Sequence, residues 1–182
     1  MDAAVGTLHQ KGFNGTSVQD ITDAAKAPKG SFYNHFESKE SLAVEALDRY
    51  WAIILQPLGM LDDKSTPALA RLKGYFERLG NIARDQEYQT GCMIGNMSAE
   101  MPHQSPIMKA RLAVIWAAWS SAIESCVKDA QADGSIRTDL DATTVASFLL
   151  NSWQGAVMRT KVDRSALAFD AFVDVVFTGL AQ

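Results

Sequence analysis

TSVQDITDAAKAPKGSFYNHFESKESL, residues Thr16–Leu42, is the stretch that decides how this sequence folds. Apolar side chains recur in it at helical spacing on both sides of a break at Lys26-Ala27. Thr16 and Gln19 have the spacing of a capping box, so we expect the first helix of the pair to begin at Thr16. The pattern predicts two short helices joined by a tight turn.

The second helix of the pair is expected to begin near Pro28, because proline suits the first turn of a helix. Its aromatic residues share one side as far as Phe36, and Ser38 is then placed to cap a longer helix. These lengths and breaks are typical of a helix-turn-helix unit, in which the second helix enters the major groove of DNA. Spacing of this kind also occurs in other helical bundles, so it indicates DNA binding only together with the residue types.

Helical periodicity extends over the rest of the chain, and strand signals are almost absent. Further helices are predicted over residues 2–11, from 67 to beyond 82, over 91–101, from 107 to about 132, and over 141–161 and 166–180. The predicted fold is therefore all-α, with about nine helices. Pro57, Gly59 and the polar stretch 62–66 interrupt the chain. We therefore expect a helix-turn-helix domain over residues 1–47 and a larger helical domain over 48–182, with the fourth helix as the connecting rod.

The bulk composition of the 182 residues is that of an ordinary globular protein, with 47% hydrophobic and 21% charged residues. The net charge of −4 gives no support to nucleic-acid binding. Residues 1–47 do not change this, because they hold four lysines and six acidic residues. A claim of DNA binding must rest on where the charges lie.

Several classes of protein are not indicated by the sequence. It has no apolar run long enough to span a membrane and no signal-peptide pattern, so we expect a cytoplasmic protein. Cys92 and Cys126 have no metal-ligand spacing and are expected to be buried, reduced thiols. There is no nucleophile elbow, metal motif or phosphate-binding loop, so we expect neither an enzyme nor a cofactor.

About a dozen positions in Thr16–Leu42 resemble the TetR family of transcriptional regulators in order and spacing. The matching pattern is T-x-x-x-I-x-x-x-A, a turn, K-G-S-F-Y-x-H-F and then S-K-E-x-L. The resemblance covers roughly residues 1–50, and the remaining helices agree with the family in number and length. It implies a ligand-responsive regulator, usually a repressor, that binds a palindromic operator as a dimer and is released by a small organic inducer.

The recognition helix must present short polar or basic groups at its N-terminal end, because that end enters the groove. Lys29 can reach a phosphate or a guanine edge, and Gly30 allows the helix backbone to approach the DNA closely. By resemblance, Tyr33, His35 and Lys39 hold phosphates. The full set of expected DNA-binding residues is Thr16, Ser17, Lys29, Gly30, Ser31, Tyr33, Asn34, His35 and Lys39.

The sequence departs from the family pattern in the turn and at its start. The turn usually contains a left-handed glycine, whereas this chain has Lys26, at a cost of about 1 kcal/mol. The following cap position is usually Ser or Thr, and here it is Pro28, so the cap hydrogen bond is expected to be lost. Relative to the family, the first helix is expected to be truncated and to lack a basic arm for the minor groove.

The second domain is rich in side chains suited to lining an apolar pocket with a few polar groups. Residues with this pattern more often belong to the hydrophobic core of a protein. The more specific hypothesis is that they line a ligand pocket. We expect a small organic inducer to contact some of Cys92, Asn96, Glu100, Trp116, Trp119, Trp153 and Gln154.

The last two long helices carry wide apolar faces, and three phenylalanines lie on the terminal one. By resemblance, these helices pair across a two-fold axis to form a homodimer. We expect the inducer to move the fourth helix and to spoil the spacing of the two DNA-binding heads.

Two alternatives stay open at this point. The segment GCMIGN around Cys92 looks like the corresponding stretch of family members that sense electrophiles through a cysteine, and a helix start would lower the pKa of a thiol there. The other alternative is a small-molecule-binding helical protein without DNA activity, which the acidic head and truncated first helix would suit.

Overall fold

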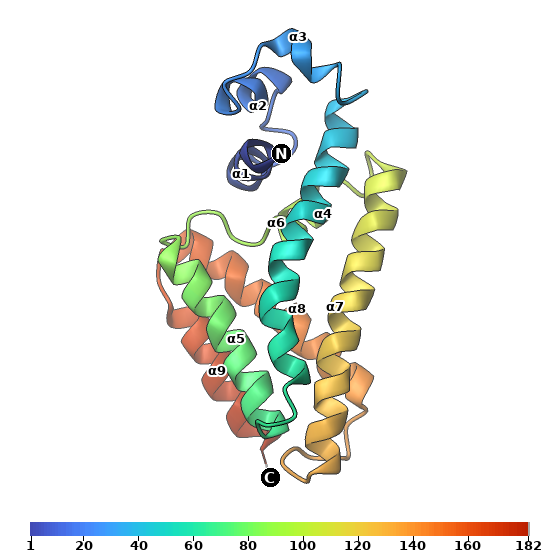
Figure 1. The fold of residues 1–182 in the computed structure, drawn as a ribbon. Coiled ribbons are helices and arrows are strands. Elements are labelled where there is room, and N and C mark those ends of the chain that lie inside the picture. The colour runs from blue at the N-terminus through green and yellow to red at the C-terminus, as the bar shows by residue number, and fades with distance from the viewer. Residues whose placement is uncertain (182) are drawn as a thin grey trace. The chain divides into compact units, whose positions relative to one another are not determined.

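The computed structural model describes residues 1–181, and these residues fold into α-helices (Figure 1). The helices are α1 (Asp2–Lys11), α2 (Val18–Ala24), α3 (Lys29–Phe32), α4 (Lys39–Leu58), α5 (Ala68–Asp85), α6 (Met93–Glu100), α7 (Pro106–Ala132), α8 (Ala142–Asp163) and α9 (Leu167–Leu180), with a 3-10 turn, η1 (Gly59–Asp62), after α4. Over residues 1–181 no strand forms, and one isolated bridge pairs Ile136 with Ala181. The predicted all-α class and number of helices are confirmed for this part of the chain.

Contacts divide the chain into two compact units. The head unit comprises Met1–Ile54 and Cys92–Ile115, and the body unit comprises Leu55–Gly91 and the chain from Trp116 onward. Helices α4 and α7 each begin in the head unit and continue into the body unit. The sequence placed a boundary after residue 47. It had no means of grouping α6 with the head, because that grouping depends on contacts between residues distant in the chain.

In the head unit, α1 contacts α2 and α6, and α2 contacts α3. Each of these helices contributes a few apolar side chains to the interior, because each presents apolar residues at helical spacing on one side only. The buried residues include Leu8, Ile21, Phe32, Leu42, Leu47, Met93 and Met97. The head is therefore stabilised by an apolar core to which several helices contribute, among them the long helix α4.

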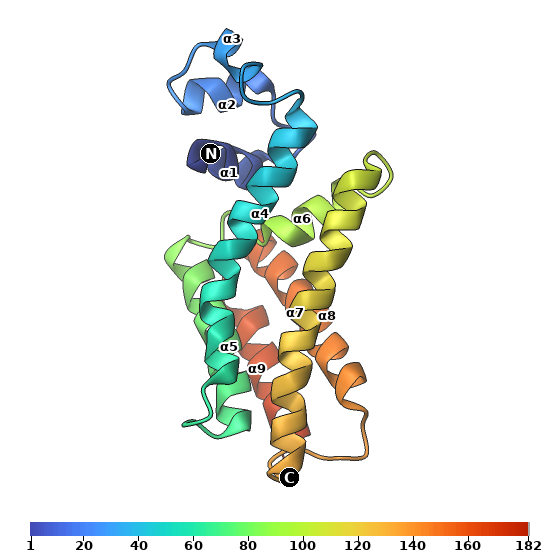
Figure 2. The ribbon, with the colours of Figure 1, turned by 45° about the vertical axis from the view of Figure 1, so that its right-hand side comes forward.

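In the body unit, α8 packs on α9, and α9 packs on α5, as the two views show (Figures 1 and 2). Phe76 of α5 is fully buried at the centre of an aromatic cluster. Its ring centroid lies 5.4 Å from that of Trp153, 5.0 Å from Phe172 and 6.2 Å from Phe177. Aromatic side chains bury large apolar areas, so this cluster forms the core of the unit.

The apolar face of α9 has a different use from the one we predicted. Phe169, Phe172 and Phe177 are all buried inside the unit, against Trp153 or Phe76. They cannot pair across a dimer axis, because the fold already uses them. The large apolar side chains that α8 and α9 expose are Phe148, Met158, Val162, Leu167 and Val175.

The length and apolarity needed to cross a membrane are not combined in any helix of residues 1–181.

Candidate nucleic-acid interface

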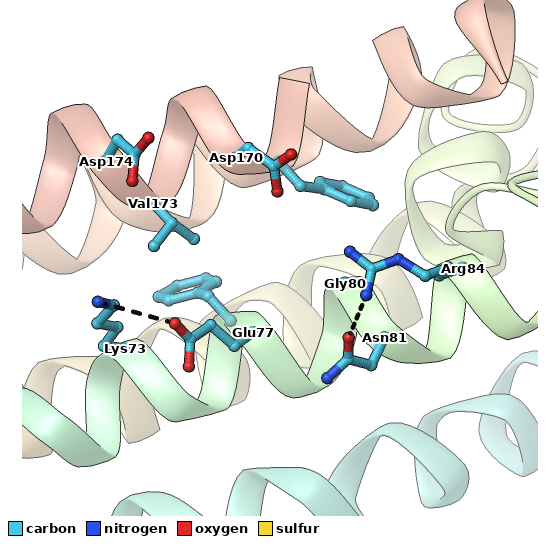
Figure 3. Close-up of a pocket in the computed structure, with 10 residues that line it drawn as sticks. Lys73, Glu77, Gly80, Asn81, Arg84, Asp170, Val173 and Asp174 are labelled. Carbon is cyan, nitrogen blue, oxygen red and sulfur yellow. Dashed lines mark hydrogen bonds and ion pairs between the residues drawn. The ribbon is translucent and has the colours of Figure 1, made fainter. Parts of the chain in front are cut away.

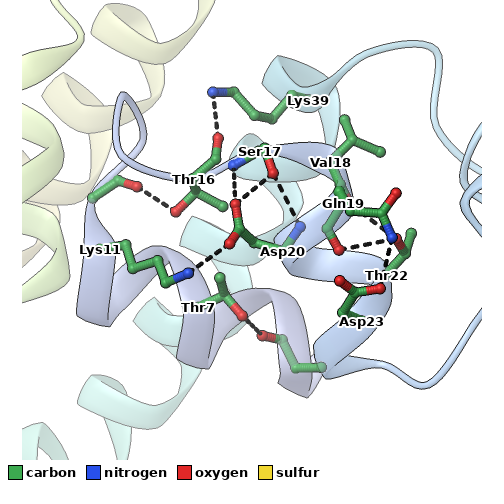
Figure 4. A network of polar contacts seen from close by, with 12 residues as sticks. Thr7, Lys11, Thr16, Ser17, Val18, Gln19, Asp20, Thr22, Asp23 and Lys39 are labelled. Carbon is green, nitrogen blue, oxygen red and sulfur yellow. Dashed lines mark hydrogen bonds and ion pairs between the residues drawn. The ribbon is translucent and has the colours of Figure 1, made fainter.

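Helix α2 begins at a capping box one residue later than predicted. Ser17 is the N-cap, its hydroxyl accepts the Asp20 N–H at 3.1 Å, and its own N–H donates to the Asp20 carboxylate at 2.8 Å (Figure 4). The predicted pair, Thr16 and Gln19, does not form the box. Thr16 is buried, and its hydroxyl donates to the Gly12 carbonyl at 2.6 Å.

The carboxylate of this box also binds the end of α1. Lys11 Nζ lies 2.6 Å from Asp20 Oδ1. The hydrogen bonds from Lys11 and from Ser17 stabilise the ionised form, so the pKa of Asp20 lies well below its usual value. The N-terminus of α2 therefore already carries an anionic group. Of the two DNA-binding residues predicted there, Thr16 is buried and Ser17 is exposed.

The turn between α2 and α3 has the left-handed residue that the sequence predicted. Lys26 has φ 54°, its N–H donates to the Asp23 carbonyl at 3.0 Å, and the Ala27 N–H donates to the Thr22 carbonyl at 2.9 Å. These two bonds form a Schellman motif, which ordinarily has glycine at the left-handed position. The turn is thus of the expected type, with a lysine side chain exposed on it.

Helix α3 is shorter than predicted. Regular α-helix covers Lys29–Phe32, and the chain continues to Phe36 in turns, with the His35 N–H donating to the Phe32 carbonyl at 3.0 Å. Pro28 is the N-cap and makes no side-chain cap bond, as expected. The Ser31 hydroxyl donates instead to the Pro28 carbonyl at 2.7 Å. Phe32 is buried and anchors the segment to the head.

Around this anchor the segment exposes the polar and basic groups that the sequence singled out. Lys29 and Gly30 are exposed at the start of α3, and a side chain at Gly30 would meet open space. Tyr33 is 61% exposed, with its ring edge-on to Phe32 at 5.1 Å. Asn34 and His35 are also exposed. The structure therefore brings five of the predicted DNA-binding residues together on one outward-facing segment.

Lys39 lies at the start of α4, and its ammonium group is engaged inside the head. It donates to the Phe13 carbonyl at 2.8 Å and to the Thr16 carbonyl at 2.7 Å, and it lies 4.1 Å from the centroid of the Phe13 ring. An ammonium group has three donors, so one remains for a phosphate. Lys39 therefore also fixes the α1–α2 turn through these two bonds, a role that the sequence did not indicate.

The predicted ligand-binding residues fall in both units. Cys92 is buried at the N-cap of α6, Asn96 is half-buried on the same helix, and Glu100 ends it. The Glu100 carboxylate accepts the Asn14 N–H at 2.8 Å, so it binds the α1–α2 turn. Sequence reasoning missed this contact.

In the body unit, the predicted tryptophans take part in aromatic packing. Trp119 is buried and donates its indole N–H to the Tyr75 hydroxyl at 2.7 Å, while Trp116 stacks on it at 5.6 Å. Trp153 stacks on Phe169 at 4.5 Å. The Gln154 Nε2 atom is buried and has no hydrogen-bond partner within residues 1–181. Burying an amide nitrogen without a hydrogen bond is costly, so this amide is expected to bind a partner other than residues 1–181.

Both cysteines are buried thiols, as predicted. Burial raises the pKa of Cys126 to about 11, and its Sγ donates to the Ala68 carbonyl at 3.5 Å. Cys126 is therefore a protonated core residue at neutral pH. Among residues 1–181, no cluster of three or more His, Cys, Asp or Glu side chains has the arrangement needed to hold a metal ion.

A groove of about 580 Å³ lies between α5 and α9 in the body unit (Figure 3). Phe76 and Phe169 are among the residues that line it, and Asp170 and Asp174 line the α9 side. On the α5 side, Lys73 lies 3.8 Å from Glu77, and Arg84 donates to Asn81 at 2.9 Å. The periodicity of the sequence did not reveal this groove, because its walls come from segments far apart in the chain.

Two descriptions of known families match the chain. Residues 1–46 match "Bacterial regulatory proteins, tetR family", and residues 68–176 match "Tetracyclin repressor-like, C-terminal domain". The first match covers the helix-turn-helix, and the second covers most of the body unit.

Two curated relatives align with most of the chain. It is 40% identical to the HTH-type transcriptional repressor DhaR of Mycobacterium sp. (strain GP1), over 94% of this chain and 85% of that protein. It is 30% identical to the transcriptional regulator AcuR of Cereibacter sphaeroides, over 88% of this chain and 74% of that protein. The crystal structure of a regulatory protein TetR from Rhodobacter sphaeroides superposes with a TM-score of 0.93 at 25% identity, covering 99% of this chain and 96% of that one.

Proposed function

This chain belongs to the tetR family of bacterial regulatory proteins, and we propose that it represses transcription by binding a palindromic operator as a dimer until a small organic inducer releases it. The observation that carries the DNA-binding part is the exposed segment around Phe32. Lys29, Gly30 and Tyr33 face outward there on a short helix that follows a Schellman turn. We further propose that it acts on the chromosome in the cytoplasm and catalyses no reaction.

The roles of the exposed residues follow from their chemistry. Lys29 and Asn34 carry groups that recognise base edges in the major groove, and Gly30 leaves room for the DNA backbone. Tyr33 and His35 are assigned to phosphates, together with Ser17 and the third donor of Lys39. Phosphate contacts fix the register of the protein, while base contacts determine the sequence it selects.

Substitution of the exposed segment tests this assignment. Lys29→Ala is expected to weaken binding to operator DNA by about 1–3 kcal/mol and to relax selection at one base pair. Tyr33→Phe is expected to weaken binding more uniformly across sequences and to leave the slope of log affinity against log salt nearly unchanged, because a neutral hydroxyl releases no counterion. Lys73→Ala, a lysine substitution in the body unit, is the matched control. Operator binding by Lys29→Ala and Tyr33→Phe at the wild-type level would overturn the assignment.

The exposed apolar residues of α8 and α9 support a dimer through these helices. Phe148, Met158 and Val162 recur on α8 at the spacing of one helix face, and each is at least 59% exposed. A large exposed apolar patch is typical of an interface. Met158→Glu is expected to produce monomers in analytical ultracentrifugation, whereas Met60→Glu, an exposed methionine outside α8 and α9, should leave the dimer intact.

The inducer site is proposed on the predicted pocket residues, and Gln154 is the one with direct support. Its buried and unpartnered amide nitrogen suits a ligand oxygen. Small organic metabolites that raise the melting temperature of the protein should do so less for Gln154→Leu. Equal shifts for the two proteins would remove Gln154 from the site.

Electrophile sensing through Cys92 is not better supported than release by a bound ligand. Cys92 is only 7% exposed, whereas thiols that react with electrophiles are usually accessible.

A further inference from the structure

The five-residue turn between α1 and α2, Gly12–Thr16, is bound from two sides by opposite charges. The Glu100 carboxylate at the end of α6 accepts the Asn14 N–H at 2.8 Å. The Lys39 ammonium at the start of α4 donates to two carbonyls of the same turn, those of Phe13 and Thr16. A backbone turn between two helices is thus fixed by side chains from two other helices, all within the head unit.

Gly12 makes the close approach of Glu100 possible. Its φ is 75°, and a β-carbon at this position would overlap the Glu100 carboxylate. An alanine there would be strained by the backbone conformation and would also displace the carboxylate. The side chain of Glu100 therefore reaches the turn through space that only glycine leaves open.

Helix α6 is well suited to transmit a displacement to this turn. Met93, Ile94 and Met97 are fully buried along its length, so the helix is fixed by packing and moves as a unit. Cys92 is its N-cap, and Glu100 is its last residue. The start of α7 is joined to α4 as well, by the Ser105 hydroxyl to Glu40 and by Arg111 to Asp48.

We propose that Glu100 is a positioning residue for operator binding: through its bond to Asn14, α6 fixes the α1–α2 turn and so the placement of α2 and α3. This inference rests on the proposed function, because it assigns the control of operator affinity to one contact. The turn leads directly into the capping box of α2, where Ser17 follows Thr16. A displacement of the turn therefore also displaces α2 and, with it, the helix-turn-helix. Glu100 acts on DNA binding through the backbone and does not touch the DNA.

The test compares four variants of the full-length protein on duplex DNA enriched from a random pool by the wild-type chain. Glu100→Ala removes the acceptor, and Glu100→Asp keeps the charge but shortens its reach. Glu100→Gln keeps a carbonyl oxygen that can accept the Asn14 N–H. Glu45→Ala removes an exposed carboxylate of α4 in the same unit and is the matched control. Hydrogen exchange of the Asn14 amide and the melting temperature are measured beside DNA affinity.

Glu100→Ala and Glu100→Asp are expected to weaken DNA binding about tenfold and to speed exchange at Asn14. Glu100→Gln should restore both within about threefold, and Glu45→Ala should change neither. A purely structural role would lower the melting temperature of Glu100→Asp without changing the affinity of the folded protein, and that result would overturn the proposal. So would wild-type affinity in Glu100→Ala with rapid exchange at Asn14.

Failure of the proposed function gives a different result. If the wild-type chain enriches no DNA sequence, the repressor assignment falls. Exchange at Asn14 then still reports whether Glu100 holds the turn: unchanged protection in Glu100→Ala would overturn the contact itself.

Discussion

The head and body units are stabilised by different kinds of contact. In the body, Phe76 is surrounded by Trp153, Phe172 and Phe177, and the cluster is buried. In the head, the turns between short helices are fixed by Lys39, Glu100 and the Ser17–Asp20 capping box. An aromatic core resists local change, because removing any part of it leaves a cavity. The polar bonds that fix the turns of the head can be broken at a lower cost than an aromatic core, so we expect these turns to shift more readily than the body.

The comparison predicts the largest loss of stability for Phe76→Ala. The substitution leaves a cavity beside Trp153, Phe172 and Phe177 and is expected to lower the free energy of unfolding by about 3–5 kcal/mol. Ile107→Ala, which truncates a side chain 65% exposed in the head unit, should change it by less than about 0.5 kcal/mol. Chemical denaturation measures both. Similar losses for the two variants would contradict the central role given to the aromatic cluster.

Removing one hydroxyl group in each unit should separate the two regions further. Tyr75→Phe deletes the acceptor of the buried Trp119 indole and is expected to cost about 1–3 kcal/mol. Tyr33→Phe deletes a hydroxyl from an exposed residue of the head and should leave the unfolding free energy unchanged. Tryptophan fluorescence follows unfolding in both proteins. An unchanged unfolding free energy in Tyr75→Phe would show that the Trp119–Tyr75 bond adds no stability.

Lys26→Gly is expected to stabilise the head by about 1 kcal/mol, because glycine adopts the left-handed conformation of the turn without strain. Lys26→Ala removes the same charge but keeps the β-carbon, so it should give no such gain. The melting temperatures of the two variants measure the difference. Equal melting temperatures would mean that the turn relaxes around the lysine.

The smallest effect is expected in acid, from the exposed Lys11–Asp20 pair. The pKa of Asp20 is lowered in the folded head, so its contribution is present above the unfolded value of about 3.9 and is lost as the pH falls below it. Asp20→Asn should therefore reduce the dependence of stability on pH below about 4 and leave the slope near pH 7 unchanged. Water screens this exposed pair. A steep change near neutral pH would contradict the assignment.

Sequence patterns anticipated the features that depend on neighbours along the chain. The periodicity of Thr16–Leu42 predicted the paired helices, and the resemblance to the family pattern implied a left-handed conformation at Lys26, which φ 54° confirms. The predicted start of α2 was wrong by one residue, because two neighbouring residues can each act as the N-cap. Ser17 rather than Thr16 caps α2, because the Thr16 hydroxyl bonds back to Gly12.

Patterns failed where a residue has two compatible surroundings. Phe169, Phe172 and Phe177 form an apolar face that suits either a core or a dimer interface, and only packing against Trp153 and Phe76 decides between them. Glu100 was predicted as a polar group of a ligand pocket, which stays a prediction, and the sequence did not indicate that its carboxylate binds the α1–α2 turn. In both cases the residue type suggested a role, but the sequence did not show which residues it would contact.

By itself, the sequence determined an all-α chain with a helix-turn-helix, because helix periodicity, caps and turns are properties of residues a few positions apart. The ordered residues of Thr16–Leu42 carried its resemblance to the tetR family. The tertiary structure decided that α6 belongs with the head and that Lys39 and Glu100 hold one turn between them. Asn14 and Glu100 are 86 residues apart. No local pattern specifies such a pair, since its energy arises only when the fold has brought the two groups together.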